Sequence, residues 1–185
     1  MPLIDRFLPH YQFSERHEIR IRAPAARVLD LACKVDMADD PVVAGLLRLR
    51  GMPGRIGAAF GRTPQPDQWR GFGLHNFTPL GRDADREVAF GLIGQFWQST
   101  GGLVPTPTAD AFAAFDQPGV AKLVMNFVAH ADGHATRLQT RTHVHCPDAA
   151  TVRRFRPYWL LIRPASGWIR RRALARVKAL AESGT

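Results

Sequence analysis

Two alternating segments on either side of Asp132-Gly133 constrain this 185-residue chain more than any other feature. Both central residues of a type I′ turn need positive φ, which Asp and Gly tolerate, so this dipeptide predicts a tight β-hairpin. In that register Ala131 lies opposite His134, which fixes every pair farther along the two strands. The chain is therefore expected to build an antiparallel sheet around this hairpin.

The two sides of the predicted hairpin differ in character, as side chains that alternate with period two allow. The first side is apolar apart from two hydroxyls and consists of Ala121, Leu123, Met125, Phe127, Leu138, Thr140, Thr142 and Val144. The second side is polar and consists of Lys122, Asn126, His130, Arg137, Gln139, Arg141 and His143. We expect the first side to face the core and the second to face solvent.

Shorter patterns predict the other strands and helices. Alternation and β-forming residues favour four extended segments, over residues 16–22, 74–80, 86–94 and 95–100. Helical spacing favours a short helix directly after Pro24 and a second short helix over residues 41–49. The region 51–73 is rich in Gly and Pro and is expected to be a long loop.

From Asp148 onward the hydrophobic period becomes that of a helix, and Asp148 is suited to be its N-cap. One face of this helix carries the apolar residues Val152, Phe155, Trp159, Ile162, Ile169, Val177 and Leu180. Pro157 and Pro164 each remove a backbone donor inside this span. We therefore expect a long C-terminal helix that is bent or broken near residues 164–167.

The whole net charge of +9 lies in the same segment. Between Ala149 and Ala181 there are nine basic residues and no acidic one, whereas the rest of the chain has 16 of each sign. Two interpretations stay open: a solvated outer face, or a grip for nucleic-acid phosphates or an anionic membrane. The solvated face is favoured, because the segment also carries an apolar face for docking onto the sheet and no nucleic-acid motif accompanies the charge.

Length and composition fit a single domain over residues 1–185. No stretch approaches the roughly eighteen apolar residues of a spanning helix, and the N-terminus lacks the features of a signal peptide, so a cytoplasmic location is expected. Cys33 and Cys146 have no metal-ligand spacing and are expected to be small core residues. The sequence indicates neither a metal nor a cofactor.

The predicted elements follow the order of the helix-grip architecture: one strand, two short helices, several antiparallel strands and a long helix. Residues 17–28 (HEIRIRAPAARV) resemble the opening strand and helix of the START-type superfamily, also called SRPBCC, which includes polyketide cyclase/dehydratase-like proteins and lipid carriers. Residues 155–171, with FRPYW, IRP, SG and IRR, resemble a bacterial subgroup of it. The resemblance implies an α+β fold with a curved antiparallel sheet wrapped around the C-terminal helix. It brings no catalytic motif, so the catalytic residues are unknown.

If the sheet wraps the helix in this way, the apolar side of the hairpin becomes a wall of the interior, with the threonine hydroxyls as its polar groups. The predicted ligand-binding residues are Phe90, Leu92, Met125, Phe127, Leu138, Thr140, Thr142 and Trp159. A ligand cavity and a filled core favour the same residue types at these positions, so both stay open.

The leading hypothesis is a protein that binds an apolar or amphipathic small molecule, lipid-like or polyketide-like, between sheet and helix. The alternatives are a cyclase/dehydratase-type enzyme with His75 as general base, and electrostatic binding through the arginines. His143 and His145 would hold a metal only with a third ligand, so they are expected to be surface histidines. Specific nucleic-acid binding is not expected, while peripheral membrane contact and the oligomeric state stay open.

Overall fold

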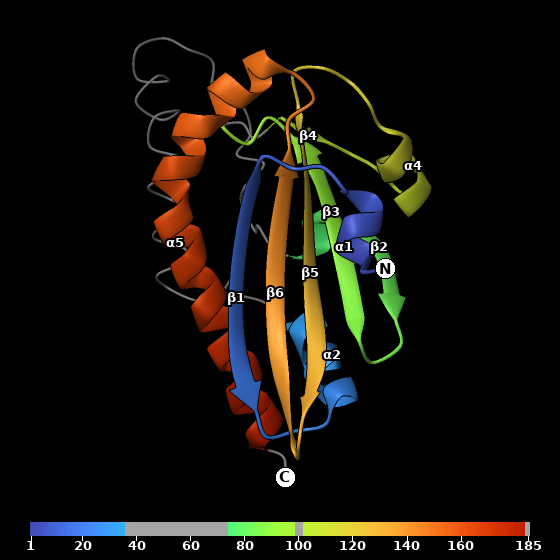
Figure 1. The fold of residues 1–185 in the computed structure, drawn as a ribbon, viewed down its shortest axis with the longest axis vertical. Coiled ribbons are helices and arrows are strands. Elements are labelled where there is room, and N and C mark those ends of the chain that lie inside the picture. Colours follow the sequence, from blue (N-terminus) through green and yellow to red (C-terminus); the bar gives the residue numbers. More distant parts are fainter. Residues whose placement is uncertain (36–73, 99–101, 184–185) are drawn as a thin grey trace.

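The computed structural model describes residues 1–35, 74–98 and 102–183, apart from the side chain of His75. The elements run in the order α1 (Leu3–Phe7), β1 (Phe13–Ile21), α2 (Ala25–Lys34), the 3₁₀ helix η1 (Leu74–Asn76), β2 (Thr78–Asp83), β3 (Glu87–Gly94), β4 (Leu103–Val104), α4 (Ala109–Ala114), β5 (Ala121–Asp132), β6 (Ala135–His145) and α5 (Ala149–Glu182). Within the described residues they form a six-stranded antiparallel sheet with the order β1-β6-β5-β3-β2, and β4 pairs with β3. Figure 1 shows this curved sheet with the long α5 running beside β1. The α+β class is thus confirmed, in an arrangement compatible with a helix grip.

The β5–β6 hairpin forms where the sequence predicts it, but the predicted register is wrong by two residues. Asp132 pairs with Ala135, so the loop is formed by the two residues between them, with a φ of 63° at Gly133. Phe127 consequently lies opposite Thr140 and not opposite the predicted partner two residues earlier. Because side chains alternate with period two, a slip of two leaves every side chain on its predicted face.

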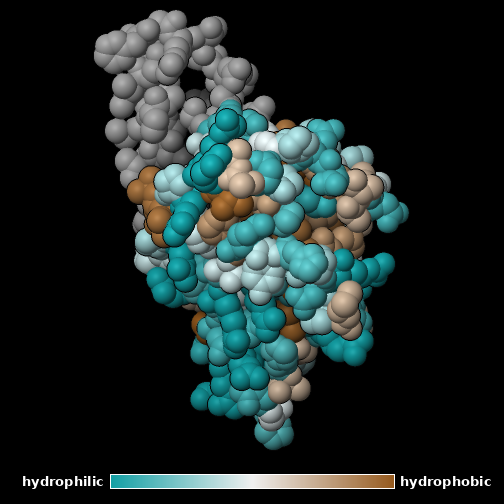
Figure 2. Space-filling model, turned by 45° about the horizontal axis from the view of Figure 1, so that its top comes forward, coloured by the Kyte–Doolittle hydropathy of each residue, from teal (hydrophilic) through white to brown (hydrophobic). Residues whose placement is uncertain are grey.

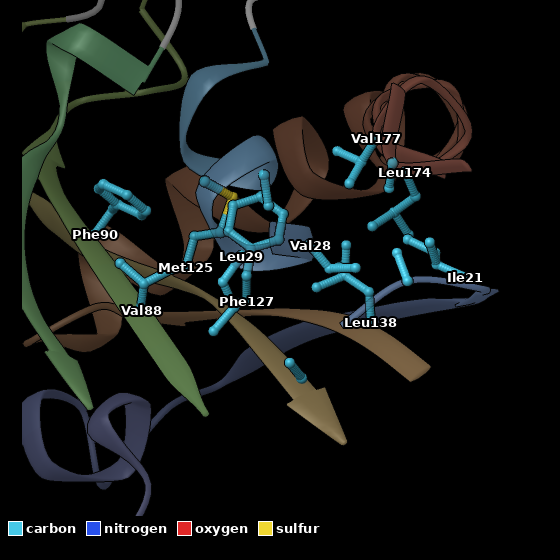
Figure 3. Packing of buried hydrophobic residues seen from close by; sticks show 14 residues of the cluster. Ile21, Val28, Leu29, Val88, Phe90, Met125, Phe127, Leu138, Leu174 and Val177 are labelled. Carbon is cyan, nitrogen blue, oxygen red and sulfur yellow. The ribbon is translucent and has the colours of Figure 1, made fainter. Parts of the chain in front are cut away.

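The inner face of the sheet, meaning the face that packs against α2 and α5, carries two hydrophobic clusters. The first joins α2, the middle strands and the C-terminal half of α5, as Figure 3 shows, through Val28, Leu29, Val88, Phe90, Met125, Phe127, Leu138, Leu174 and Val177. The second joins the other end of the strands to the N-terminal half of α5 through Leu92, Ala121, Val144, Cys146, Phe155 and Trp159. Burial of this much apolar surface is the main force that fixes α5 along the sheet.

The outer face of the sheet, opposite the inner one, is covered in part by α1 and α4, which the sequence analysis does not predict. Ile4 and Leu8 from the N-terminal segment and Phe112 from α4 pack on it with the strand residues Leu80, Ala89, Ile93 and Val124. A Cβ on Gly91 would lie 2.6 Å from the ring of Phe112, so only glycine allows α4 to approach this closely. Both helices are too short for a hydrophobic period to be recognised.

The expectation that the polar side of the hairpin faces solvent is wrong for three of its residues. Asn126, Gln139 and His143 are all buried. Tyr11 stacks on His143 with ring centroids 3.7 Å apart, and Gln139 bonds to Glu18. The segment before β1 therefore covers His143, whereas Asn126 and Gln139 find their partners on neighbouring strands, in Glu87 of β3 and Glu18 of β1. Figure 2 shows a face that is mostly hydrophilic, with brown apolar patches between the teal regions.

Several predicted segment limits need correction. The predicted strand 74–80 begins as η1, and β2 starts only at Thr78. The extended piece expected over residues 95–100 is wrong in its described part, because Gln98 N bonds to Gln95 O in a turn. The strand 86–94 and the helix after Pro24 are confirmed. The helix expected over residues 41–49 and the loop over 51–73 lie outside the described residues.

Helix α5 runs without interruption over 34 residues. Its N-cap is Asp148, as predicted, whose carboxylate accepts from Thr151 N at 2.8 Å and from the Thr151 hydroxyl at 2.6 Å. These bonds, together with one from Gly119 N, lower the pKa of Asp148 to about 2. Pro157 and Pro164 are both exposed and lie inside the helix without breaking it, and Figure 1 shows the helix bending in its N-terminal part.

Candidate functional site

All eight predicted ligand-binding residues lie between the inner face of the sheet and α5, and all are at most 8% exposed. Four of them, Phe90, Met125, Phe127 and Leu138, belong to the first inner cluster. Leu92 and Trp159 belong to the second. Thr140 and Thr142 lie between the two clusters along β6, each 2% exposed.

The two threonines belong to a larger group of polar side chains, which we call the polar belt: Glu15, His17, Thr140, Thr142, Ser166 and Arg170. Glu15 pairs with Thr142, and His17 pairs with Thr140, across β1 and β6. The Nε2 of His17 lies 2.7 Å from Oε1 of Glu15, and the Ser166 hydroxyl donates to Oε2 of Glu15 at 3.3 Å. Nη1 of Arg170 donates to the hydroxyl of Thr140 at 3.3 Å. The belt therefore separates two apolar clusters on one face.

Gly167 allows α5 to lie this close to the belt. A Cβ at that position would lie 2.6 Å from Oε1 of Glu15 and 3.2 Å from Cε1 of His17. Any larger residue would have to push the Glu15 side chain aside. The backbone of α5 thereby carries Ser166 and Arg170 onto β1 and β6, which brings together residues far apart in the sequence.

Two buried donors of the belt have no hydrogen-bond partner among the described residues: the hydroxyl of Thr142 and Nε of Arg170. Arg170 keeps part of its side chain accessible, but its Nε is buried. Desolvation lowers the pKa of Arg170, and the charge of Glu15 opposes that shift. A buried polar group without a partner costs about 1–3 kcal/mol, and an acceptor atom near these two donors would offset that cost.

The sequence pattern does not identify Glu15, His17, Ser166 and Arg170 as site residues. It counts Arg170 with the basic residues expected on a solvated surface, and for this residue the expectation is wrong. A signal is present, since Gly167, Arg170, Leu174 and Val177 are spaced by three or four residues and share one helix face. His17 alternates with the inward Ile19 and Ile21, which also places it on the inner face.

The other predicted candidates fall elsewhere. His75 lies in η1, but its side chain is outside the described part of the chain. His143 is not a surface histidine, because it is 5% exposed beneath Tyr11. Over the described residues, no group of three or more His, Cys, Asp or Glu side chains is placed to hold a metal ion.

The two cysteines are free thiols. Cys146 is buried in the second inner cluster, and desolvation raises the pKa of its thiol to about 12. Cys33 is half-buried beside the first cluster, and burial raises its thiol pKa as well. Thiolate chemistry at neutral pH is therefore disfavoured at both positions.

Comparison with known proteins adds little to this description. No family model matches the chain, and no curated protein matches it. The crystal structure of TTHA0849 from Thermus thermophilus is similar at 11% sequence identity and a TM-score of 0.35, with 91% of this chain and 99% of that chain covered.

Proposed function

We propose that this protein binds an amphipathic small molecule, whose apolar part lies on the inner face and whose acceptor oxygen lies on the polar belt. The observation that carries the proposal is the pair of buried donors, the Thr142 hydroxyl and Arg170 Nε, left without partners among the described residues. A carboxylate or carbonyl oxygen of a ligand would satisfy them, and a charged acceptor would also offset the desolvation of Arg170.

The apolar part of the ligand has candidate contacts beside the belt. Met125 lies opposite Thr142, and Phe90 lies opposite Met125 in the next strand. Both side chains keep 7–8% of their surface accessible, whereas Leu138 and Val144, nearer to α5, keep none. A chain or ring that extends from the belt would contact this residual surface.

The order of elements supports the same proposal at the level of fold. The resemblance of residues 17–28 and 155–171 to the START-type superfamily suggests a carrier or a cyclase/dehydratase-like protein. One fold hosts many functions, so the substrate class is argued from the belt and not from the resemblance.

A pair of fluorescent probes tests the proposal: a fatty acid with an apolar fluorophore, and the matching labelled alkane without the acid group. Wild-type protein is expected to bind the acid at least about 10-fold more tightly than the alkane. Thr142→Val and Arg170→Met should remove that preference. The matched control is Arg171→Met, at the neighbouring exposed arginine, which should keep it.

Two results would overturn the proposal. One is that neither probe binds to the folded wild-type protein. The other is that Thr142→Val and Arg170→Met bind the acid as tightly as wild type, which would mean that an internal water satisfies these donors. Met125→Trp is a further check, because the larger side chain should exclude both probes, with a circular dichroism spectrum to establish folding.

A second candidate, a cyclase/dehydratase-type enzyme on the same scaffold, is supported by the bond between Glu15 and His17. A carboxylate that orients an imidazole beside a binding site is an arrangement used for proton transfer. Native mass spectrometry of the freshly purified protein, followed over time, would separate the two. If the protein is an enzyme, the mass of the bound molecule should change over time on wild type but not on the His17→Gln variant. If it is a carrier, that mass should stay the same on both proteins.

A further inference from the structure

The side of α5 that faces away from the sheet carries two neighbouring exposed leucines. Leu160 is 65% exposed and Leu161 is 81% exposed. Pro157 and Pro164, both exposed, lie about one turn before and after them. We call these four residues the apolar stripe of α5. Isolated exposed leucines are ordinary, but four apolar residues on one side of a helix form a continuous surface.

Exposed arginines surround this stripe. Arg153, Arg154, Arg156 and Arg163 lie within two turns of the leucines, and none of the four forms a salt bridge within residues 1–35, 74–98 and 102–183. Four arginines of the strands and turns behave differently: Arg16, Arg20, Arg82 and Arg86 each pair with a carboxylate. Within the part of the chain that the structure describes, the arginines around the exposed apolar residues of α5 therefore have no paired carboxylate.

We propose that the apolar stripe and its arginines dock the protein on an anionic lipid bilayer. Arginines attract acidic headgroups, while Leu160 and Leu161 enter the boundary between headgroups and acyl chains. A second copy of the chain is a poorer occupant, because two arginine-rich surfaces repel each other. Nucleic acid would be attracted by the arginines, but it offers no apolar medium for the leucines.

The docking is peripheral. Across the described residues, no helix is long and apolar enough to cross a membrane. The opposite side of α5 is committed to the two inner clusters, through Phe155 and Trp159 in one and Leu174 in the other. Helix α5 therefore lies flat on the bilayer, with the sheet above it.

Flotation with lipid vesicles tests this inference without any ligand. Purified protein is expected to bind vesicles of phosphatidylcholine with about one-third phosphatidylserine, and to bind pure phosphatidylcholine at least about 10-fold more weakly. Binding should weaken between about 0.05 M and about 0.5 M salt. The double variant Leu160→Ser/Leu161→Ser and the double variant Arg153→Gln/Arg156→Gln should each lose about 10-fold or more.

Matched controls lie outside the stripe. Leu180→Ser replaces another exposed leucine of α5, and Arg86→Gln replaces an exposed arginine of the β2–β3 turn, so both should bind like wild type. The inference is overturned if wild type fails to bind anionic vesicles at low salt. It is also overturned if the double leucine variant binds as well as wild type, or if single-stranded RNA binds more tightly than the vesicles do.

Discussion

The network around Glu87 on the outer face of the sheet and the polar belt on the inner face bury polar groups in different ways. On the outer face, Glu87 is 6% exposed and accepts from Leu3 N at 2.8 Å, from Ile4 N at 3.3 Å and from the amide of Asn126 at 2.7 Å. The amide oxygen of Asn126 in turn accepts from Arg141 N. On the inner face, the Thr142 hydroxyl and Arg170 Nε have no such partner among the described residues, and outside the Glu87 network the same holds for Nδ1 of His143 and Nδ1 of His145 on the outer face.

The difference separates a structural network from the group of residues that we propose as a binding site. The outer network ties the start of α1 to β3 and β5, and each of its bonds serves the fold. In the inner belt Glu15 is bonded to His17 and Ser166, but two donors have no partner among the residues that the structure describes. Polar groups that hold the fold should be costly to remove, whereas those that await a ligand should not. Four predictions test this contrast.

The largest effect is expected from Glu87→Ala. Two backbone N–H groups of α1 and the amide of Asn126 would lose their acceptor inside the protein, so the free energy of unfolding should fall by about 3 kcal/mol. Urea unfolding measures the change. The control is Glu18→Ala, whose side chain is 41% exposed and should cost far less. Equal losses in the two variants would show that the outer network is not a stabilising unit.

The two closely approached glycines give the next largest contrast. In Gly91→Ala the new Cβ meets the rigid, fully buried ring of Phe112, and overpacking should cost about 2 kcal/mol. In Gly167→Ala the Cβ meets Oε1 of Glu15, which lies at the end of a flexible side chain and can move.

Replacing glycine by alanine stabilises a helix by about 1 kcal/mol, which should offset the cost of displacing the Glu15 side chain. The melting temperature of Gly167→Ala should therefore change little. It should nevertheless weaken binding of the fluorescent acid, because Glu15 and His17 are displaced. A large loss of stability in Gly167→Ala with unchanged probe binding would contradict the division between the two faces.

Two buried threonines on the inner face of β6 sharpen the comparison further. The hydroxyl of Thr136 donates to Ala23 O at 2.7 Å, whereas that of Thr142 has no partner in the described part of the chain. Thr136→Val should therefore cost about 1 kcal/mol, and Thr142→Val should be neutral or slightly stabilising. Both threonines are 2% exposed, so the pair is matched for burial. A greater loss in Thr142→Val would assign that hydroxyl a structural role.

The smallest effect concerns pH and the histidines of the outer face. Burial lowers the pKa of His143 below its ordinary value of 6.5, against the opposing charge of Asp5 and a bond to the Leu8 backbone; the charge of Arg141 lowers it further. The pKa of His145 is lowered by burial and by Lys122 and His10, with Asp116 opposing.

Because the unfolded chain binds these protons more readily, the stability is complete above about pH 6.5 and falls as the pH drops below it. The urea midpoint should therefore decrease between about pH 7.5 and about pH 5.5. His143→Gln/His145→Gln should reduce that decrease, whereas His134→Gln, at the exposed hairpin loop, should not. An unchanged decrease in the double variant would contradict the role of burial.

The local features of the sequence determined much of this fold. The alternating strands fixed which side of β5 and β6 is apolar, and the helical period with Asp148 fixed where α5 begins. The turn residues alone allowed two registers, because Gly133 can form a two-residue loop with Asp132 or with His134. The structure has the loop with His134, which shifts the register by two residues. The predicted faces survive the slip because two residues are a full period of a strand.

Only the tertiary structure decided what covers each face and where the polar belt forms. Ser166 and Glu15 are 151 positions apart in the sequence and meet because Gly167 lets α5 approach β1. Helix α1 is too short to show a period, yet it binds Glu87, the partner of Asn126, and Tyr11 after it stacks on His143; the sequence pattern assigns both Asn126 and His143 to solvent. Periodicity shows which side of one element is apolar. Whether a buried polar group finds a hydrogen-bond partner depends on elements that are distant in the chain.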